Sequence, residues 1–277
     1  MSVARNVPMY VRRFDAFDRV LHALLMISFL GLAATGLPLL FSDEGWARRI
    51  ASVLGSFEVA GWLHRASAAL LIVVFLLHLF RVGRRLVFER DWGIIWGPRS
   101  MVPQPRDVAD LLKHVRWFLG RGPRPEFERY TYWEKFDYWA VFWGMGIIGA
   151  SGLLLWFPVF FARFVPGWLF NVALLVHGEE ALLAVGFIFT LHFFNGHLRP
   201  EKFPMDPVIF TGRITVDELK HERPGEYART AAAGGLDALR TDPPPDWLTR
   251  LGFVTGGIAV IIGLFIVGLI LYAVLRR

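Results

Sequence analysis

The chain has 277 residues, of which 55% are hydrophobic, and its formal net charge is +6 at pH 7. Several uninterrupted apolar runs are long enough to span a membrane, which excludes a soluble globular protein. Because the chain contains no cysteine, it cannot hold an iron–sulfur cluster, a disulfide or a covalently attached c-type haem, and histidine remains as the main haem or metal ligand. The basic residues flank the apolar runs, as membrane orientation signals do, so we expect no nucleic-acid partner.

The first apolar run predicts a transmembrane helix from about Phe17 to Phe41, which is too long for a signal-peptide core. His22 lies roughly one turn inside this helix. Gly31 and Gly36 suit either close packing against another helix or the approach of a flat ring to the backbone. A polar lead with four arginines precedes the helix: Arg5, Arg12, Arg13 and Arg19.

A short polar loop leads to Ser56, a favourable N-cap, and to a second transmembrane helix from about Phe57 to Phe80. His64 and His78 lie on this helix, about 21 Å apart along its axis and about 40° apart around it. One face of the helix therefore presents an imidazole at each of two membrane depths.

The segment from Arg81 to Lys135 is polar and carries 12 Lys or Arg residues. Between Pro105 and Gly120 its apolar residues recur at helical spacing, which predicts a short helix lying on the membrane surface. We expect His114, which belongs to this segment, to be a solvated side chain.

A third transmembrane helix is predicted from about Tyr138 to Phe161. The cluster YWEKFDYW at residues 132–139 precedes it and is typical of an aromatic belt at the membrane interface. Glycines thin the surface of this helix, and either neighbouring helices or a cofactor would fit against them. These glycines are Gly144, Gly146, Gly149 and Gly152.

A fourth helix begins near Trp168 and contains the stretch HGEEALLAVGFIFTLHFFNGH at residues 177–197. Histidine and glutamate are costly in lipid and are usually functional there. His177 and His192 lie about 22 Å apart along the axis and about 60° apart around it. Because two helices repeat nearly the same two-level spacing, we interpret these histidines as ligands.

The chain is polar again from about Asn195 to Arg250, and its prolines argue against a compact domain made from this segment alone. A fifth helix, from about Phe253 to Leu275, has neither charge nor histidine. Its small residues recur four apart in two pairs, Gly252 with Gly256 and Ala259 with Gly263. This pattern indicates close packing against a partner's helix or against a helix of the same chain.

These elements predict an all-α integral membrane protein, with a four-helix haem-binding transmembrane bundle and a fifth, C-terminal transmembrane helix. We assign residues 1–200 to the bundle, including the loop 81–135 with its surface helix. A cytoplasmic polar segment, 201–250, and the C-terminal helix, 251–277, follow.

The basic residues also predict the orientation of the chain. The segments after the second and fourth helices carry 12 and eight Lys or Arg residues, whereas 42–57 and 158–167 carry two and one. The positive-inside rule therefore places the N-terminus in the cytoplasm and the C-terminus on the outer side of the membrane. Arg276 and Arg277 oppose this assignment, and the larger loops outweigh them.

In this topology His64 and His177 lie toward the outer side of the membrane. The inner side holds four histidines: His22, His78, His192 and His197. Imidazoles from two helices at one depth suit a bis-histidine b-type haem that transfers electrons. We therefore expect at least two haems b.

A third haem is a further hypothesis. His192 and His197 point about 140° apart around their helix and cannot easily serve one iron together. His78 and His197 are therefore candidates for a third pair of ligands. The alternative is that His197 ends its helix at the interface and His78 hydrogen-bonds locally.

The sequence resembles a known family in several motifs. The stretch DRVLHALLMISFLGLAATGLPL at 18–39, WLHR at 62–65 and the two-histidine fourth helix resemble the membrane cytochrome b subunits of formate dehydrogenases (the gamma subunit) and nickel–iron hydrogenases. YWEKFDYWAVFWG at 132–144 and HFFNGHLRPEKFPMD at 192–206 are similar to bacterial cytochrome b proteins associated with multihaem c-type cytochromes.

The resemblance covers about residues 10–230 and leaves the fifth helix unaccounted for. It implies that His64 and His177 hold the outer haem and that His22 and His192 hold the inner one. His78 and His197 are additional to the formate dehydrogenase pattern.

The expected function is electron transfer between a pool of menaquinone or ubiquinone and a partner redox protein. The partner would be a c-type cytochrome or an iron–sulfur subunit on the outer face. A quinone site is expected at the inner end, where hydrogen-bonding groups and proton carriers converge, unless these are ordinary interfacial residues. They are Glu134, Lys135, Asp137 and Asn195.

Glu180 follows His177 by one helical turn, and we expect it either to orient that ligand or to be a protonatable group near the outer haem. The alternative function is a proton or cation transporter lined by the histidines and by Glu179 or Glu180. Such a path needs polar groups at mid-membrane depth, and the centre of the second helix, ASAALLIVVFLL, offers almost none.

Overall fold

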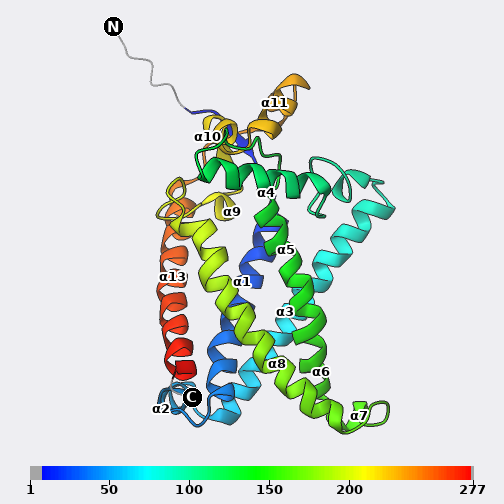
Figure 1. Ribbon diagram of the computed structural model, residues 1–277, viewed down its shortest axis with the longest axis vertical. Helices are drawn as coiled ribbons and strands as arrows, with labels where there is room; N and C mark the ends of the chain where they lie inside the picture. The colour runs from blue at the N-terminus through cyan, green and yellow to red at the C-terminus, as the bar shows by residue number, and fades with distance from the viewer. Residues whose placement is uncertain (1–7, 276–277) are drawn as a thin grey trace. The chain divides into compact units, whose positions relative to one another are not determined.

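The computed structural model describes residues 8–275 (Figure 1). Arg5 of the polar lead, and Arg276 and Arg277, which oppose the orientation, lie outside the described residues. The chain divides into two compact units, each assembled from segments far apart in the sequence. The first unit, here called the polar unit, comprises the chain up to Arg19, 81–139 and 207–252. The second unit, here called the bundle, comprises 20–80, 140–206 and the chain from Phe253 onward.

Five of the described helices are long and apolar enough to cross a membrane, so the predicted all-α membrane fold is confirmed. They are α1 (Ala16–Leu40), α3 (Phe57–Val87), the run Tyr132–Trp156, the run Trp168–Leu198 and α13 (Asp246–Leu275). The turns contain the short helices α2 (Gly45–Leu54) and α7 (Pro158–Phe161). Ser56 caps α3 as predicted, because its Oγ accepts a hydrogen bond of 3.1 Å from the backbone N–H of Val59.

Two of the long runs contain π-helical turns. The first run consists of α5 (Tyr132–Gly144), the π-turn η2 (Met145–Gly149) and α6 (Ala150–Trp156), and the second of α8 (Trp168–Phe187), η3 (Ile188–His192) and η4 (Phe194–Leu198). A π-turn holds one residue more than an α-turn and is frequent at functional sites. His177 and His192 are one residue farther apart in the sequence than His64 and His78 on α3. The π-turn η3 accommodates this extra residue.

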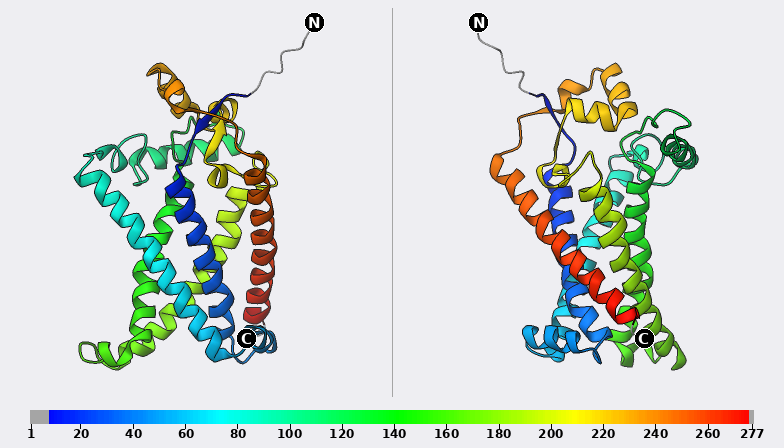
Figure 2. Two further views of the ribbon diagram at one scale, coloured as in Figure 1. Left: turned by 180° about the vertical axis from the view of Figure 1, so that it is seen from behind. Right: turned by 60° about the vertical axis from the view of Figure 1, so that its left-hand side comes forward.

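The helix α13 runs beside other long helices of the bundle (Figure 2), and its small residues pack against them. Ala259 and Ala273 are buried in one core with residues of α1 and α8. A Cβ atom on Gly256 would lie 2.9 Å from Cε1 of His197, so only glycine permits this approach. Of the two interpretations of the pattern, packing within the chain is therefore the one that the structure supports.

The polar unit contains a three-stranded antiparallel sheet in the order β2–β1–β3. Its strands are β1 (Tyr10–Arg12), β2 (Arg213–Thr215) and β3 (Arg240–Thr241). Short helices surround it: α9 (Val208–Thr211), α10 (Val216–Glu222), α11 (Pro224–Ala232) and α12 (Leu236–Leu239). The segment after residue 206 folds together with the N-terminal strand, because Val11 of β1 completes its apolar core with Val208, Ile214 and Leu219.

The predicted surface helix is present as α4 (Pro105–Phe118), after the short η1 (Trp92–Ile94). Its apolar face is exposed and its acidic residues are buried, as a helix lying on a membrane surface requires. The prediction for His114 is wrong, because its side chain is buried. The ring stacks on Trp117 and Trp133, and its Nδ1 lies 3.0 Å from the hydroxyl of Tyr132.

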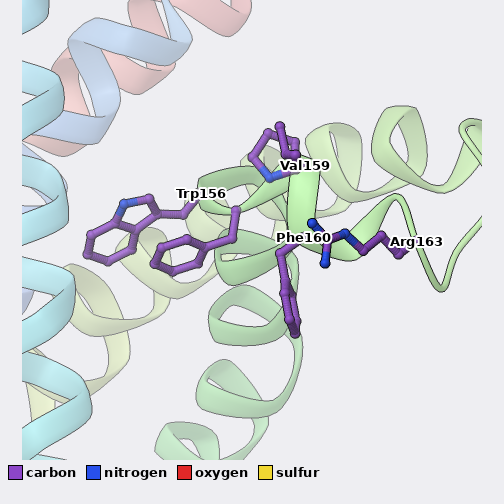
Figure 3. Close-up of a pocket in the computed structure, with 6 residues that line it drawn as sticks. Trp156, Val159, Phe160 and Arg163 are labelled. Carbon is purple, nitrogen blue, oxygen red and sulfur yellow. The ribbon is translucent and has the colours of Figure 1, made fainter.

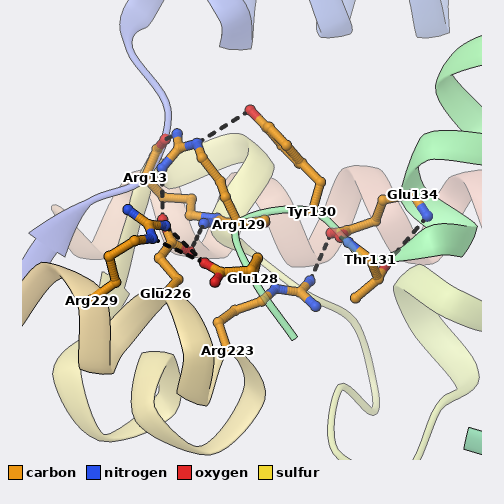
Figure 4. Close-up of polar contacts among 9 residues, drawn as sticks. All are labelled: Arg13, Glu128, Arg129, Tyr130, Thr131, Glu134, Arg223, Glu226 and Arg229. Carbon is orange, nitrogen blue, oxygen red and sulfur yellow. Dashed lines mark hydrogen bonds and ion pairs between the residues drawn. The ribbon is translucent and has the colours of Figure 1, made fainter. Parts of the chain in front are cut away.

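A buried network of ion pairs joins distant segments of the polar unit (Figure 4). Glu226 on α11 binds Arg13 at 2.5 Å and Arg129 at 3.0 Å, and the side chains of Arg13 and Glu226 are only 5% and 9% exposed. Burial lowers the pKa of Arg13, and the carboxylate of Glu226 counters part of that shift. The network therefore links the N-terminal strand and the segment before α5 to α11.

We expect Glu226→Gln to lower the free energy of unfolding of the polar unit by about 3 kcal/mol, because it leaves two arginines without their buried counter-charge. Glu89→Gln is the matched control, since it removes an ion pair with Arg84 in which both side chains are exposed. The difference in the free energy of unfolding is measured by denaturant titration, with the rate of limited trypsin digestion as the readout of unfolding. Equal effects of the two substitutions would contradict the structural role of the network.

Candidate functional site

Two of the predicted ligands face each other in the bundle. The ring centres of His64 on α3 and His177 on α8 lie 6.2 Å apart, and the ring planes make an angle of 77°. An ion bound between two imidazoles by bonds of about 2 Å, with each ring centre about 1 Å behind its nitrogen, would separate the centres by roughly this distance. The pair therefore fits the axial positions of one bis-histidine haem iron.

The hydrogen bonds of His64 define which ring nitrogen is free. Its Nδ1 lies 3.1 Å from Oγ1 of Thr35, and the backbone of Leu32 also bonds the ring. The Thr35 hydroxyl donates its own proton to the carbonyl of Gly31 at 2.6 Å, so its oxygen accepts from the imidazole. Nδ1 therefore carries the proton, and Nε2 keeps the lone pair that binds a metal.

His177 is held in the same tautomer by the run α5 to α6. Its Nδ1 lies 3.0 Å from the carbonyl of Ile148 and 3.3 Å from Oγ of Ser151. Ile148 belongs to the π-turn η2, where the ordinary helical hydrogen-bond ladder is interrupted and a carbonyl can accept from a side chain. Because a carbonyl can only accept, Nδ1 is again protonated and Nε2 is free.

Glu180 does not orient His177, since the carbonyl of Ile148 takes that role. The Oε2 atom of Glu180 instead accepts a hydrogen bond of 3.2 Å from Nε1 of Trp143. The sequence misses this arrangement because a π-turn, and hence a carbonyl available to a side chain, has no signature in residue spacing. Of the two roles expected for Glu180, a protonatable group near the histidine pair remains.

His22 and His192 are the second expected pair. His22 lies on α1 and His192 at the end of η3, and the two rings are close enough to interact electrostatically. Both side chains are half-buried. The structure thus brings together a histidine from each of the two helices that the resemblance pairs.

His78 and His197 have different neighbours. The ring of His78 packs edge-on against Phe142 of α5, with the ring centres 6.2 Å apart. His197 packs on Phe193 at 5.0 Å and approaches Gly256 of α13. A third haem between His78 and His197 stays a prediction.

Two of the four expected quinone-site residues have structural partners in the polar unit. Glu134 and Thr131 form a capping box at the start of α5, in which the carboxylate of Glu134 accepts a hydrogen bond of 2.8 Å from the backbone N–H of Thr131. The same carboxylate forms an ion pair with Arg223 at 2.7 Å. The motif Thr-x-x-Glu signals this helix start, six residues before the predicted one. Lys135 is 4% exposed and contacts both carboxylate oxygens of Asp107 at 2.9 Å.

The remaining two residues, Asp137 in the polar unit and Asn195 in the bundle, are half-buried. A quinone contact at any of the four residues stays a prediction.

A hollow of about 380 Å³ lies at the turn between α6 and α7 (Figure 3). Aromatic and aliphatic side chains line it together with Arg163, and none of the histidines does. It is therefore separate from the histidine pairs and plays no part in the chemistry described here.

We expect Gly152→Ala to displace the His177 ring and to lower the haem content, because the added Cβ would lie 2.9 Å from its Cε1 atom. Gly146→Ala is the control on the same run, since a Cβ there meets no atom within 4 Å. The ratio of haem to protein, measured as the pyridine haemochrome, reports the effect. If Gly152→Ala kept the wild-type ratio, His177 would not be a ligand held at this position.

Comparisons with known proteins identify the family of the chain. The sequence profile of the prokaryotic cytochrome b561 family matches residues 13–199. The cytochrome b556(fdo) subunit of formate dehydrogenase from Escherichia coli K12 is 24% identical over 174 residues, which cover 62% of this chain and 72% of that subunit. The nitrate-inducible formate dehydrogenase cytochrome b556(Fdn) subunits of Escherichia coli K12 and Shigella flexneri are 21% identical over 174 residues, with 62% of this chain and 71% of each subunit covered.

The family match spans α1, α3, α5, α6 and α8 and ends before α13. Haem b is the cofactor that the family implies, and the free Nε2 atoms of His64 and His177 fit it. The chain belongs to the prokaryotic cytochrome b561 family and is a multi-pass membrane cytochrome b that takes part in electron transfer.

Proposed function

We propose that the chain carries electrons between a quinone pool and a partner redox protein through stacked bis-histidine haems b. The observation that supports this most is the opposed pair of His64 and His177, whose Nδ1 protons are held so that both Nε2 atoms remain free. His64 with His177 would hold one haem, and His22 with His192 another. A haem b held by such a pair would supply reversible one-electron chemistry.

The residues of this chain supply the surroundings that such electron transfer needs. Thr35 and the carbonyl of Ile148 hold a proton on each imidazole, which fixes both rings before any ligand arrives. His78 with His197 remains the proposed position of a third haem.

The proposed orientation places the N-terminus in the cytoplasm and the C-terminus in the periplasm of a bacterial inner membrane. Counts of basic residues in the connecting segments support it. The partner would be a c-type cytochrome or an iron–sulfur subunit on the outer face. The relatives named above are subunits of formate dehydrogenases, which supports a role within a larger redox complex.

The proposed electron carrier in the membrane is menaquinone or ubiquinone. Asp137 and Asn195 are each a candidate contact, as are Glu134 and Lys135, which also hold α5 in place through their ion pairs with Arg223 and Asp107. A carboxylate and an amide supply the acceptor and donor groups that quinone oxygens and a quinol proton require.

Replacement of His177 by alanine tests the ligand assignment. We expect His177→Ala and His64→Ala each to remove the same single haem and to leave any other, because the two histidines would hold that haem together. His221→Ala is the control, since His221 is an exposed histidine on α10. Haem stoichiometry and reduced optical spectra measure the loss, and an unchanged stoichiometry in both variants would refute the assignment.

Quinol-driven haem reduction tests the proposed quinone contacts. We expect Asp137→Asn and Asn195→Ala to slow reduction at least several-fold with the haem content intact, because each removes a hydrogen-bonding or proton-accepting group. Asp217→Asn, at an exposed carboxylate of α10, should keep the wild-type rate. Wild-type rates in all three variants would move the quinone site elsewhere, with Glu180 as the next position to test.

A further inference from the structure

The two opposed histidines are held by the same set of groups on two different helices. Each ring contacts three groups of a neighbouring helix. They are a backbone carbonyl, the hydroxyl three residues later in the sequence, and the glycine that follows the hydroxyl. We call these groups the first clamp, formed by Leu32, Thr35 and Gly36 on α1, and the second clamp, formed by Ile148, Ser151 and Gly152.

The distances in the two clamps agree closely. The hydroxyl oxygen lies 3.1 Å from Nδ1 in the first clamp and 3.3 Å in the second. Each hydroxyl donates to the carbonyl four residues before it, at 2.6 Å and 2.7 Å. A Cβ on the glycine would lie 3.0 Å and 2.9 Å from Cε1 of the histidine. The pair α1 and α3 therefore repeats the local geometry of the pair α6 and α8.

The repeat is also visible in the sequence. Residues 32–36 read LAATG and residues 148–152 read IGASG, so two small residues separate the carbonyl from the hydroxyl in both. Small residues at these positions allow the imidazole to approach the helix backbone. The same five-residue pattern thus serves both members of one opposed pair.

The clamps also define how each ring is turned. An N–H bond of imidazole lies in the plane of the ring, so the direction of its acceptor fixes the rotation of that plane about the metal–nitrogen axis. The two clamps lie on different helices, and the ring planes that they hold are 77° apart. At a low-spin ferric iron, nearly perpendicular imidazole planes leave two d orbitals close in energy and give a highly anisotropic EPR signal, whereas parallel planes give an ordinary rhombic one.

We propose that Thr35 and Ser151 are positioning residues that keep the imidazole planes of His64 and His177 nearly perpendicular. The haem held by these histidines then has a highly anisotropic low-spin ferric state. This inference rests on the proposed function, because it takes His64 and His177 as the two axial ligands of one iron.

EPR of the oxidised, haem-loaded protein, combined with a redox titration, tests the proposal. The wild type should show a highly anisotropic signal that disappears in His177→Ala. In Thr35→Val combined with Ser151→Ala, this signal should move toward the rhombic form. The midpoint potential of that haem should rise, because a weaker acceptor at Nδ1 makes the imidazole a poorer donor to ferric iron.

Conservative and control variants separate positioning from packing. Thr35→Ser and Ser151→Thr keep a hydroxyl and should restore the wild-type signal and potential. Thr190→Val is the matched control, because the Thr190 hydroxyl donates to the carbonyl four residues before it at 2.6 Å from an exposed position on η3. It should change neither measurement.

The outcomes distinguish this inference from the proposed function. If His64→Ala and His177→Ala leave the haem content unchanged, the proposed function fails at this pair. If those variants lose the haem but Thr35→Val and Ser151→Ala keep the wild-type signal and potential, the positioning role is overturned and the ligand assignment stands. Loss of the haem from the conservative variants Thr35→Ser and Ser151→Thr would also overturn the positioning role. These variants keep the hydroxyl, so their failure would mean that the two side chains matter only for packing.

Discussion

An imidazole placed among apolar helices loses its hydration, so each of its ring nitrogens needs a partner within the protein or a bound ligand. In His64 and His177 one nitrogen finds that partner in oxygen atoms of a neighbouring helix. This choice leaves the second nitrogen unprotonated, and the two ring centres lie 6.2 Å apart. A membrane bundle can therefore hold two metal ligands in place through neutral oxygen acceptors.

The oxygens that accept these protons are not freely available in a regular helix, where each carbonyl already bonds an N–H one turn later. The bundle provides them in two ways. A π-turn interrupts the ladder near Ile148, and the hydroxyls of Thr35 and Ser151 bond back to their own helix while still accepting from an imidazole. Gly36 and Gly152 are required by the same approach, at a cost in helix propensity of about 1 kcal/mol each.

Much of this arrangement could be predicted from the sequence, because hydrophobic length and helical periodicity are local properties. The transmembrane spans and the two depths of the histidines follow from them, and so does the surface helix α4. The partners across the interior could not be predicted in the same way. Spacing indicates that Glu180 lies one turn after His177, but it does not indicate that Trp143 binds Glu180 or that a carbonyl binds His177.

The polar unit was harder to predict for a related physical reason. Its core and its ion pairs join segments that are more than a hundred residues apart, such as Arg13 and Glu226. Charged residues near a membrane helix look like orientation signals, and Glu134 and Lys135 do look so in the sequence. Only the burial of Lys135 against Asp107 distinguishes a structural ion pair from a group that could exchange protons with a quinone.

The fifth helix bears on the one histidine whose role is least explained by the family pattern. The family match ends at residue 199, just after His197, and α13 lies beyond it. Because Gly256 of α13 lets His197 approach its backbone, and because Met205 packs at the same glycine, α13 forms part of the immediate surroundings of this imidazole. The outer face of α13 carries large apolar side chains suited to lipid. The helix therefore contacts the bundle through the face that carries its small residues. It contributes to the environment of His197 whether that histidine is a ligand or ends its helix.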